Sequence, residues 1–259
     1  MSLGTVLILG GSSGIGLGVA KEVVKSGARV VIASSNQKKV FDAVENLNRI
    51  TSEQQAFGYV IDLSNEVALE SNIIKLLEYS SSLAVSEHLS GQLSHIVHCA
   101  GELKEPPLLK DWSPVGAFTG WTIRYLTALT IAKHGPSFMV PGRQASITFT
   151  TGSLVDKPFA GLSTVLGQQG AIEAAARCLA KELAPLRVNV VSPGVVNTPI
   201  LAQLAETEVG RQRLAIFRSD NILGDVATVE EAAQPYLYLM RDSFQTGNVI
   251  RSDGGRLLK

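Results

Sequence analysis

The chain is poor in cysteine and in charge. Its 259 residues include two cysteines, Cys99 and Cys178, which fall at an apolar predicted strand end and in a predicted helix. Small buried thiols in a reducing compartment explain this placement better than a disulfide does. Lys and Arg total 23, Asp and Glu also total 23, and no basic run occurs, so the composition argues against a nucleic-acid partner.

No segment reaches about 18 uninterrupted apolar residues, the length that a membrane-spanning helix requires. The N-terminal residues are apolar, but no positively charged segment precedes them and glycines interrupt them, which is typical of a core strand and not of a signal peptide. We therefore expect a cytoplasmic protein with no membrane partner. Hydrophobic residues make up 45% of the chain, enough for a large core, and the length predicts one domain over residues 1–259.

The stretch from Thr5 to Gly18 organises the rest of the chain. Residues 5–9 predict a buried strand, the glycines after them a tight turn, and the apolar spacing of 19–25 a helix. In such a turn backbone N–H groups can approach a pyrophosphate, and the helix dipole favours its negative charge. A second strand at 29–33 completes a βαβ unit, which favours a dinucleotide site over a purely structural turn. The residues expected to hold the cofactor here are Gly10, Ser12, Ser13, Gly14, Ile15 and Gly16.

Strands and helices alternate along the remaining chain. The further strands are predicted at 55–61, 93–99, 145–150, 187–191 and 248–251. The further helices are predicted at 37–50, 64–78, 115–133, 164–184, 200–217 and 228–240, with the serines at 80–82 as a loosened connection and 102–114 as a proline-rich loop. This alternation predicts an α/β fold, a single doubly wound (Rossmann-like) domain with a parallel sheet of about seven strands.

The spacing Gly10-x-x-x-Gly14-x-Gly16 resembles the glycine motif of the short-chain dehydrogenase/reductase family, although Leu9 stands where the family usually has Thr. Four further segments resemble family motifs in the expected order: Asp62-Leu63, 98–101, 192–199 and 252–255. The resemblance therefore covers nearly the whole chain. It implies contacts to the adenine, the ribose and the nicotinamide carboxamide by Asp62, Leu63, Ala100, Gly101, Pro193, Gly194, Val196 and Thr198. For Asp62 alone, capping of the following helix is an equally good explanation.

The end of the second strand indicates which nicotinamide cofactor binds. NAD sites place a carboxylate about 20 residues past the glycines to bind the ribose 2′-OH, and none is present here. Ser34, Ser35 and Asn36 instead offer neutral donors, and Lys38 offers a cation that suits a 2′-phosphate. The alternative is a solvated helix start with ordinary lysines. We expect NADP(H) as the cofactor.

The resemblance fails at the family's catalytic residues. The family uses a Tyr-x-x-x-Lys pair with an upstream Ser and Asn, in which the Lys lowers the pKa of the Tyr that transfers the substrate proton. In this chain Val165 stands at the Tyr position, Gln169 at the Lys position, Gly152 at the Ser position and Arg124 at or near the Asn position. Ordinary carbonyl reduction would therefore need another proton donor.

Two residues are candidates for a replacement role. Arg124 would lie beside the vacated centre and could hold a carboxylate, an enolate oxygen or the cofactor ribose; a structural salt bridge is an equally good explanation. Asp156 could act as an acid or as counter-ion to a cationic substrate, although a surface Asp is the commoner case. His98 is interpreted as a core imidazole, whereas Phe159, with Trp112 and Trp121, could line an apolar pocket or belong to the core.

The chain also resembles a fungal secondary-metabolism branch of the family that lacks the Tyr and Lys, has Arg at the Asn position, and includes NADPH-dependent iminium reductases that steer a cyclisation. The first hypothesis is accordingly an NADP(H)-dependent reductase of a hydrophobic small molecule, with an imine or iminium as one candidate substrate. The alternatives are a non-redox cyclase or isomerase and a catalytically silent cofactor-binding protein. No metal site is expected. The family resemblance implies a homodimer or homotetramer formed through the helices around Arg124 and Ala175.

Overall fold

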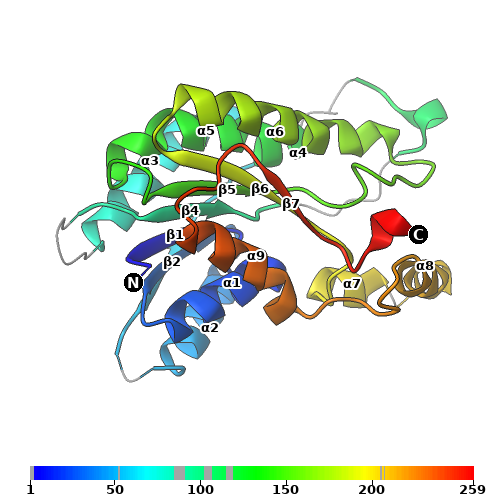
Figure 1. The fold of residues 1–259 in the computed structure, drawn as a ribbon, viewed down its shortest axis with the longest axis horizontal. Coiled ribbons are helices and arrows are strands. Elements are labelled where there is room, and N and C mark those ends of the chain that lie inside the picture. The colour runs from blue at the N-terminus through cyan, green and yellow to red at the C-terminus, as the bar shows by residue number, and fades with distance from the viewer. Residues whose placement is uncertain are drawn as a thin grey trace.

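A parallel sheet of seven strands forms the centre of the molecule in the computed structural model, which describes residues 3–51, 53–84, 91–101, 107–114, 119–204, 206 and 208–259 (Figure 1). The strand order is β3-β2-β1-β4-β5-β6-β7, and every neighbouring pair is parallel. The direction of the chain across the sheet reverses between β1 and β4, where ligands bind in open α/β sheets. The predicted fold class is confirmed. The strands are β1 (Thr5–Leu9), β2 (Arg29–Ser34), β3 (Ala56–Val60), β4 (His95–His98), β5 (Ser146–Thr150), β6 (Arg187–Pro193) and β7 (Val249–Ser252).

Helices cover both faces of the sheet, and each face has its own apolar core (Figure 1). One face carries α1 (Gly14–Lys25), α2 (Gln37–Asn48) and α9 (Val229–Arg241). The other carries α3 (Glu66–Ser82), α4 (Thr119–Trp121), α5 (Thr127–His134) and α6 (Ser163–Glu182). The helices α7 (Pro199–Leu204) and α8 (Glu208–Ser219) lie near the C-terminus of the chain. This arrangement leaves the carboxyl ends of the strands for a ligand.

The helices α3 and α9 begin with side-chain caps. The Thr228 side chain accepts a hydrogen bond from the Glu231 backbone, and the Glu231 carboxylate accepts one from the Thr228 backbone, so α9 begins with a complete capping box. Asn65, and not Asp62, caps α3: its Oδ1 accepts from the Ala68 backbone N–H. The Asp62 carboxylate instead accepts from the backbone and the hydroxyl of Ser64, at 2.8 and 2.7 Å. The helix-cap explanation of Asp62 is therefore wrong.

The structure corrects the prediction for the serines at 80–82. These residues do not loosen the chain, because α3 continues to Ser82. The hydroxyls of Ser80 and Ser82 donate to the Leu76 and Tyr79 carbonyls, both at 2.7 Å, and so satisfy themselves within the helix.

Two predicted helices prove to be composite. The described part of the segment predicted as one helix at 115–133 consists of α4, a π-helical turn (Thr122–Leu126) and α5, while residues 115–118 lie outside the described residues. The segment predicted as one helix at 200–217 consists of α7 and α8. The loop predicted at 102–114 is described from residue 107, where it contains a short 3₁₀ helix (Leu109–Asp111).

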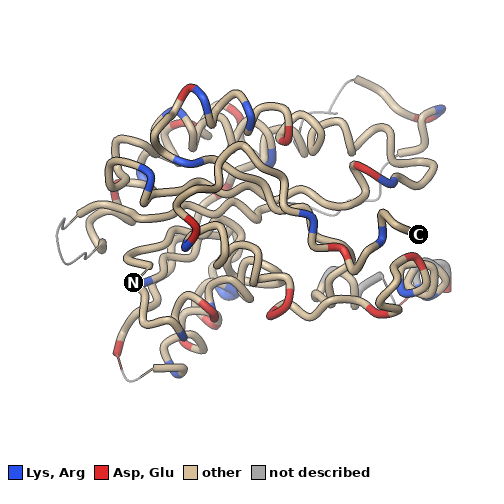
Figure 2. The backbone as a smooth tube through the Cα atoms, in the orientation of Figure 1, with Lys and Arg blue, Asp and Glu red and all other residues tan. Residues whose placement is uncertain are grey.

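Charge is spread over the molecule and not gathered on one face. Figure 2 shows Lys and Arg interspersed with Asp and Glu along the described backbone. None of the helices in the described part of the chain has the length and hydropathy needed to cross a membrane. Both cysteines are free thiols, with Cys178 exposed on α6.

Candidate active site

The glycine turn after β1 is packed too tightly for any other residue at its key positions. Gly10 has φ +83°, and a Cβ there would lie 2.6 Å from the Ala100 backbone nitrogen. A Cβ at Gly16 would collide with the Gly10 carbonyl oxygen, and one at Gly14, φ +55°, would lie 3.3 Å from Thr198 Cγ2. The turn therefore brings β1, β4 and the segment after β6 within contact of one another.

The N-terminus of α1, the positive end of its helix dipole, is not capped by a side chain of the protein. Ser13 is the N-cap residue, with extended backbone and no side-chain capping hydrogen bond, and the first turn holds no acidic residue. The first backbone N–H groups of a helix have no partner within the helix, so they offer donors and a favourable dipole to an anion. Together with the glycine cradle, these residues fit the pyrophosphate of a dinucleotide.

A cavity of about 190 Å³ lies at the carboxyl ends of β5 and β6. It brings together five residues predicted for the cofactor site. One comes from the start of α1, and four come from the end of β6 and the segment that follows it. The predicted residues in its wall are Ile15, Pro193, Gly194, Val196 and Thr198. The wall is completed by Thr151, Gly152, Ser153, Leu154, Val195 and Arg256. Gly194 is required here, because a Cβ would lie 2.8 Å from the Asp253 Cα.

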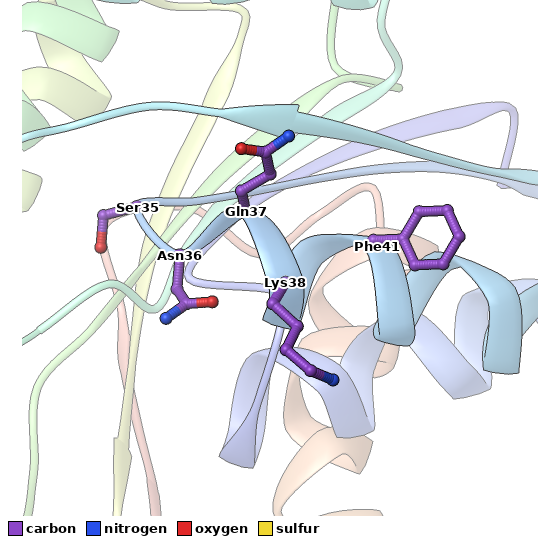
Figure 3. A pocket seen from close by; sticks show the side chains of 5 residues that line it. All are labelled: Ser35, Asn36, Gln37, Lys38 and Phe41. Atoms are coloured by element: carbon purple, nitrogen blue, oxygen red, sulfur yellow. The ribbon is translucent and has the colours of Figure 1, made fainter.

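A second hollow lies where β2 runs into α2, at the position expected for the adenosine end of the cofactor. It is lined by Ser35, Asn36, Gln37, Lys38 and Phe41. Figure 3 shows the side chains of Asn36 and Lys38 pointing away from that of Gln37.

Two of these lining side chains already have partners. Asn36 caps α2 through Oδ1, which accepts from the Lys39 backbone at 2.9 Å, so its amide nitrogen is left to face a ligand. Lys38 pairs with Asp42 at 2.6 Å, and their contact raises the pKa of the lysine. Ser34 ends β2, and its carbonyl accepts from the Ile61 backbone beside Asp62 and Leu63.

One of the altered catalytic positions lies at the same cavity, and a second lies next to it. Gly152 lies in its wall, and a Cβ at Gly152 would be 3.5 Å from the Oε1 of Gln169. Val165 lies in the first turn of α6, one turn before Gln169. An aliphatic side chain and a neutral amide therefore occupy the positions where the family has its proton donor and its cation.

Arg124 lies beside this centre on the π-helical turn. Its guanidinium occupies the space over Gly101, where any Cβ would collide with Nη2 and Cζ. Burial lowers the pKa of Arg124 below its usual range. Within the described residues the guanidinium has neither a carboxylate nor a hydrogen-bond partner, so a salt bridge within the subunit is not found there, whereas a salt bridge to a second subunit is untested. A partly desolvated cation beside the cofactor motif is suited to hold an oxygen of a ligand.

His98, at the end of β4, supports that turn. Its Nε2 lies 3.0 Å from the Ile123 carbonyl oxygen and 3.3 Å from that of Arg124. Burial lowers the pKa of His98 to about 4, so the ring is neutral at physiological pH. The prediction that His98 is a core imidazole agrees with this environment.

Asp156 does not have the environment of an acid. Arg251 donates to both of its carboxylate oxygens, at 2.8 and 2.9 Å, and this contact lowers the pKa of Asp156. Asp156 is therefore a carboxylate at neutral pH, and it is not among the described residues that line the cavity. The structure thus argues against the proton-donor hypothesis, because the charge is already committed to an ion pair.

The predicted aromatic residues separate in space. Phe159 packs against Phe217 of α8 with ring centroids 5.6 Å apart, and the Arg256 guanidinium lies over it at 5.1 Å. Trp121 makes an edge contact with Tyr125, whereas Trp112 is 42% exposed on the loop before α4. Phe159 thus contacts Arg256, a residue of the cavity wall.

Sequence reasoning missed Arg256 and Asp220. Arg256, only 2% exposed, lines the cavity, and its Nε donates to Asp220 Oδ2 at 2.6 Å. The position of Arg256 directly after the glycines of the C-terminal motif was the one available signal, and nothing in the sequence connects it to Asp220, 36 residues earlier.

Comparison with known proteins agrees with this geometry. Residues 1–259 match the family model described as an SDR-like Rossmann domain, and the chain therefore belongs to the short-chain dehydrogenase/reductase family. It is 34% identical over 255 residues to the short-chain dehydrogenase/reductase ATR9 of Stachybotrys chlorohalonatus, covering 98% of this chain and 97% of that protein. It is 35% identical over 260 residues to the short-chain dehydrogenase/reductase malC of Malbranchea aurantiaca, covering 98% and 94%.

Solved structures give the same result. The MalC reductase/Diels-Alderase of Malbranchea aurantiaca superposes with a TM-score of 0.92 at 34% identity, covering 100% of this chain and 99% of that one. A short-chain dehydrogenase/reductase from Mycobacterium ulcerans gives a TM-score of 0.86 at 25% identity, covering 98% and 90%. The resemblance to fungal secondary-metabolism members of the family is confirmed.

Proposed function

We propose that this chain is an NADP(H)-dependent reductase of a hydrophobic small molecule, with an imine or iminium ion as the favoured substrate. One observation carries the proposal: the glycine cradle and the cavity are intact, while Gly152 in the cavity wall, Gln169 beside it and Val165 one helical turn before Gln169 cannot transfer a proton. Reduced nicotinamide supplies a hydride when it is bound. The chain's own residues must therefore deal with the charge that hydride addition leaves on the substrate.

The type of substrate follows from that charge. A ketone that receives a hydride becomes an alkoxide, whose conjugate acid has a pKa of about 16, near that of water. General acid catalysis normally contributes about 10²–10⁴-fold to such a step, and no acid stands at this position. An iminium ion becomes a neutral amine and needs no proton. The site therefore favours C=N⁺ over C=O.

Each part of the site has a role in this proposal. The turn residues Gly10 to Gly16 and the N-terminus of α1 hold the pyrophosphate. The apolar side chains Ile15, Leu154 and Val195 exclude water from the cavity. The guanidinium of Arg124, packed over Gly101, holds an oxygen of the cofactor ribose or of the substrate.

The preference for NADP(H) rests on the hollow at the end of β2. The described residues that line it include no carboxylate, and they offer the Asn36 amide and the Lys38 ammonium. Lys38 is 83% exposed at its side chain and pairs with Asp42, so it can exchange that partner for a 2′-phosphate at small cost.

The decisive experiment is a titration of the purified protein with NADPH and NADH, followed by cofactor-oxidation assays with matched ketones and cyclic imines. We expect NADPH to bind more tightly and to be oxidised with imines alone. Turnover of a ketone at a rate equal to that of its imine counterpart would refute the substrate assignment. Failure of both nucleotides to bind at millimolar concentration would refute the reductase assignment.

A second candidate function is a non-redox cyclisation. It is favoured by the similarity to a solved protein titled a reductase/Diels-Alderase, at 34% identity over the whole chain. Conversion of a candidate substrate by the protein without nucleotide would support it.

We also propose that the chain forms a homodimer or homotetramer through the helical segments around Arg124 and Ala175. Ala174 is exposed on α6, and the small residues around it allow close approach of a second helix. Sedimentation at micromolar concentration tests this, because a monomer there would contradict it.

A further inference from the structure

One carboxylate joins three segments of the chain beside the cavity. Asp220 directly follows α8; its Oδ1 accepts from Lys157 Nζ at 2.7 Å, and its Oδ2 accepts from Arg256 Nε at 2.6 Å. Lys157 lies in the segment between β5 and α6, and Arg256 begins the short 3₁₀ helix Arg256–Leu258. We call the three residues Lys157, Asp220 and Arg256 the Asp220 cluster.

The Asp220 cluster is largely shielded from solvent. Arg256 is 2% exposed, and the side chain of Asp220 is 17% exposed. Burial opposes the ionisation of Asp220, but the hydrogen bonds and charges of the two cations outweigh this effect and lower its pKa. Asp220 is therefore a carboxylate at physiological pH. Removing its charge would leave two cations without their shared partner, which is costly where solvent is scarce.

Other contacts join the same segments. The rings of Phe159 and Phe217 have centroids 5.6 Å apart, and the Arg256 guanidinium lies 5.1 Å from the centroid of Phe159. The backbone N–H of Ile222 donates to the Gly254 carbonyl at 3.1 Å. Figure 1 shows the C-terminal residues beside α8. The end of α8 is thus fixed to two other segments by charge, by aromatic packing and by the backbone.

The Asp220 cluster contacts the cavity wall at Ser153. The Ser153 carbonyl accepts from Arg256 Nη1 and from the Lys157 backbone N–H, both at 3.0 Å. The Ser153 N–H donates to the Pro193 carbonyl at 2.9 Å. Ser153 and Pro193 line the cavity, and so does Gly152, at the position where the family has its serine. Both cation-bearing residues of the cluster therefore hold the backbone of the wall next to an altered catalytic position.

We propose that Asp220 is a positioning residue for the nicotinamide end of the site. By fixing Lys157 and Arg256, its carboxylate holds the wall segment at Ser153 in place and links the end of α8 to binding in the cavity. Because such linkage is reciprocal, a ligand in the cavity also stabilises the end of α8. The inference rests on the proposed function in taking this cavity as the place of the nicotinamide.

Binding of two nucleotides to the full chain tests this role. NADPH has a nicotinamide to place in the cavity, whereas 2′,5′-ADP has none and can contact only the glycine turn and the hollow at the end of β2. Asp220→Asn keeps the size of the side chain and removes its charge. We expect this variant to bind NADPH about fivefold more weakly, the lower end of typical coupling between sites, and to bind 2′,5′-ADP unchanged, as measured by calorimetry. Partial unfolding would weaken both nucleotides alike, so the difference separates positioning from a merely structural role.

Hydrogen exchange locates the effect and needs no nucleotide. In the ligand-free chain, Asp220→Asn should speed the exchange of the Ser153 and Lys157 amides, which donate within and beside the wall, by about fivefold. Amides at the end of α8 should exchange faster as well. In the wild-type chain NADPH should slow exchange at the end of α8, and in the variant this protection should be lost.

The matched control is Glu70→Gln. Glu70 also bridges two basic side chains, Lys133 at 2.6 Å and His134 at 2.7 Å, but it joins α3 to α5, and none of these three residues lines the cavity. This variant should change neither nucleotide affinity nor exchange in the wall. If Asp220→Asn fails to fold, Lys157→Met serves instead, because it removes one cation and leaves Arg256 paired with Asp220. It should shift both measurements in the same direction.

Three outcomes would overturn the inference. These are equal losses of affinity for NADPH and 2′,5′-ADP, an unchanged NADPH affinity, and exchange of the wall amides that stays as slow as in the wild-type chain. If neither nucleotide binds the wild-type chain, the proposed reductase fails. Faster exchange of the wall amides in Asp220→Asn would then still support the positioning role, and unchanged exchange would overturn both.

Discussion

His98 is hydrogen-bonded to the backbone of Arg124, with 3.3 Å between Nε2 and the carbonyl oxygen. That carbonyl belongs to a π-helical turn, a form of helix often found at functional sites. Because a carbonyl accepts, Nε2 carries the proton, and Nδ1 is the unprotonated nitrogen, buried without a partner in the described structure. The end of β4 and the turn that carries the guanidinium are therefore joined through one imidazole.

This burial predicts an acid-sensitive fold. The pKa values of His95 and His98 are lowered to about 3 and about 4, chiefly by burial, from an ordinary value of 6.5. Both rings stay neutral in the folded chain and take up protons on unfolding, so their contribution to stability is complete above pH 6.5 and is lost as the pH falls toward 4. We expect His98→Asn to reduce the dependence of the free energy of unfolding on pH by about 1 kcal/mol per pH unit. Urea unfolding curves recorded between pH 7 and 4.5 measure this dependence. Parallel curves for variant and wild type would contradict the assignment.

Gly101 and Arg124 are predicted to be energetically coupled. In Gly101→Ala the new methyl group must displace the guanidinium, the flexible end of a long side chain, so stability should change by less than about 1 kcal/mol. NADPH affinity or turnover should nevertheless fall about tenfold in the wild-type background and hardly at all in Arg124→Gln, as a double-mutant cycle measures. Gly167→Ala is the control, because its Cβ would meet Trp121 at 3.8 Å, an ordinary contact. Additive effects at Gly101 and Arg124 would show that the overlap has no functional consequence.

Restoring the family's proton relay should change the substrate preference. In the triple variant Gly152→Ser, Val165→Tyr and Gln169→Lys, a hydroxyl, a phenol and an ammonium return to the family's positions, of which 152 lies in the cavity wall and 169 lies next to 152. We expect NADPH-dependent ketone reduction to rise about 10²-fold or more over wild type, the lower end of what general acid catalysis contributes. The single variant Val165→Tyr is the comparison, since without the lysine the phenol keeps a high pKa. A wild-type chain that already reduces ketones as fast as the triple variant would refute the argument.

Cofactor preference is predicted to depend on Asn36. Asn36→Asp keeps the Oδ1 acceptor that caps α2 and adds a negative charge to the hollow of Figure 3. We expect NADPH affinity to fall about tenfold, or about 1.4 kcal/mol, while NADH affinity holds or improves. Asn65→Asp, a cap on α3 of the same kind, controls for the effect of charge on a helix start. Equal losses for both nucleotides would indicate a structural effect and not recognition of the 2′-phosphate.

The sheet could be predicted because its strands are short apolar runs separated by helices with a clear polar face. Residues 5–9 match β1 exactly in extent, and Thr228 begins the last helix as its capping pattern indicates. Boundaries were less accurate where a side chain bonds to its own helix. Ser80 and Ser82 do so in α3, which therefore runs farther than the helix predicted to end at 78.

The candidate site could be predicted in part. The spacing of the glycines predicts the turn that would hold the cofactor. The absence of the family's Tyr and Lys follows from aligning α6 with the family motif. The ion-pair partners of the charged residues could not be predicted from the sequence. Asp156 is engaged by Arg251, 95 residues later, and Arg256 meets Asp220 only because β7 returns the chain to β6. Such pairs depend on tertiary placement, and a single sequence holds no local signal for them.

The shared space of Gly101 and Arg124 makes each position depend on the other. Any side chain at 101 would have to displace the buried guanidinium, because a Cβ there collides with Nη2 and Cζ. Position 124 can therefore hold an arginine in this packing only while position 101 carries no side chain.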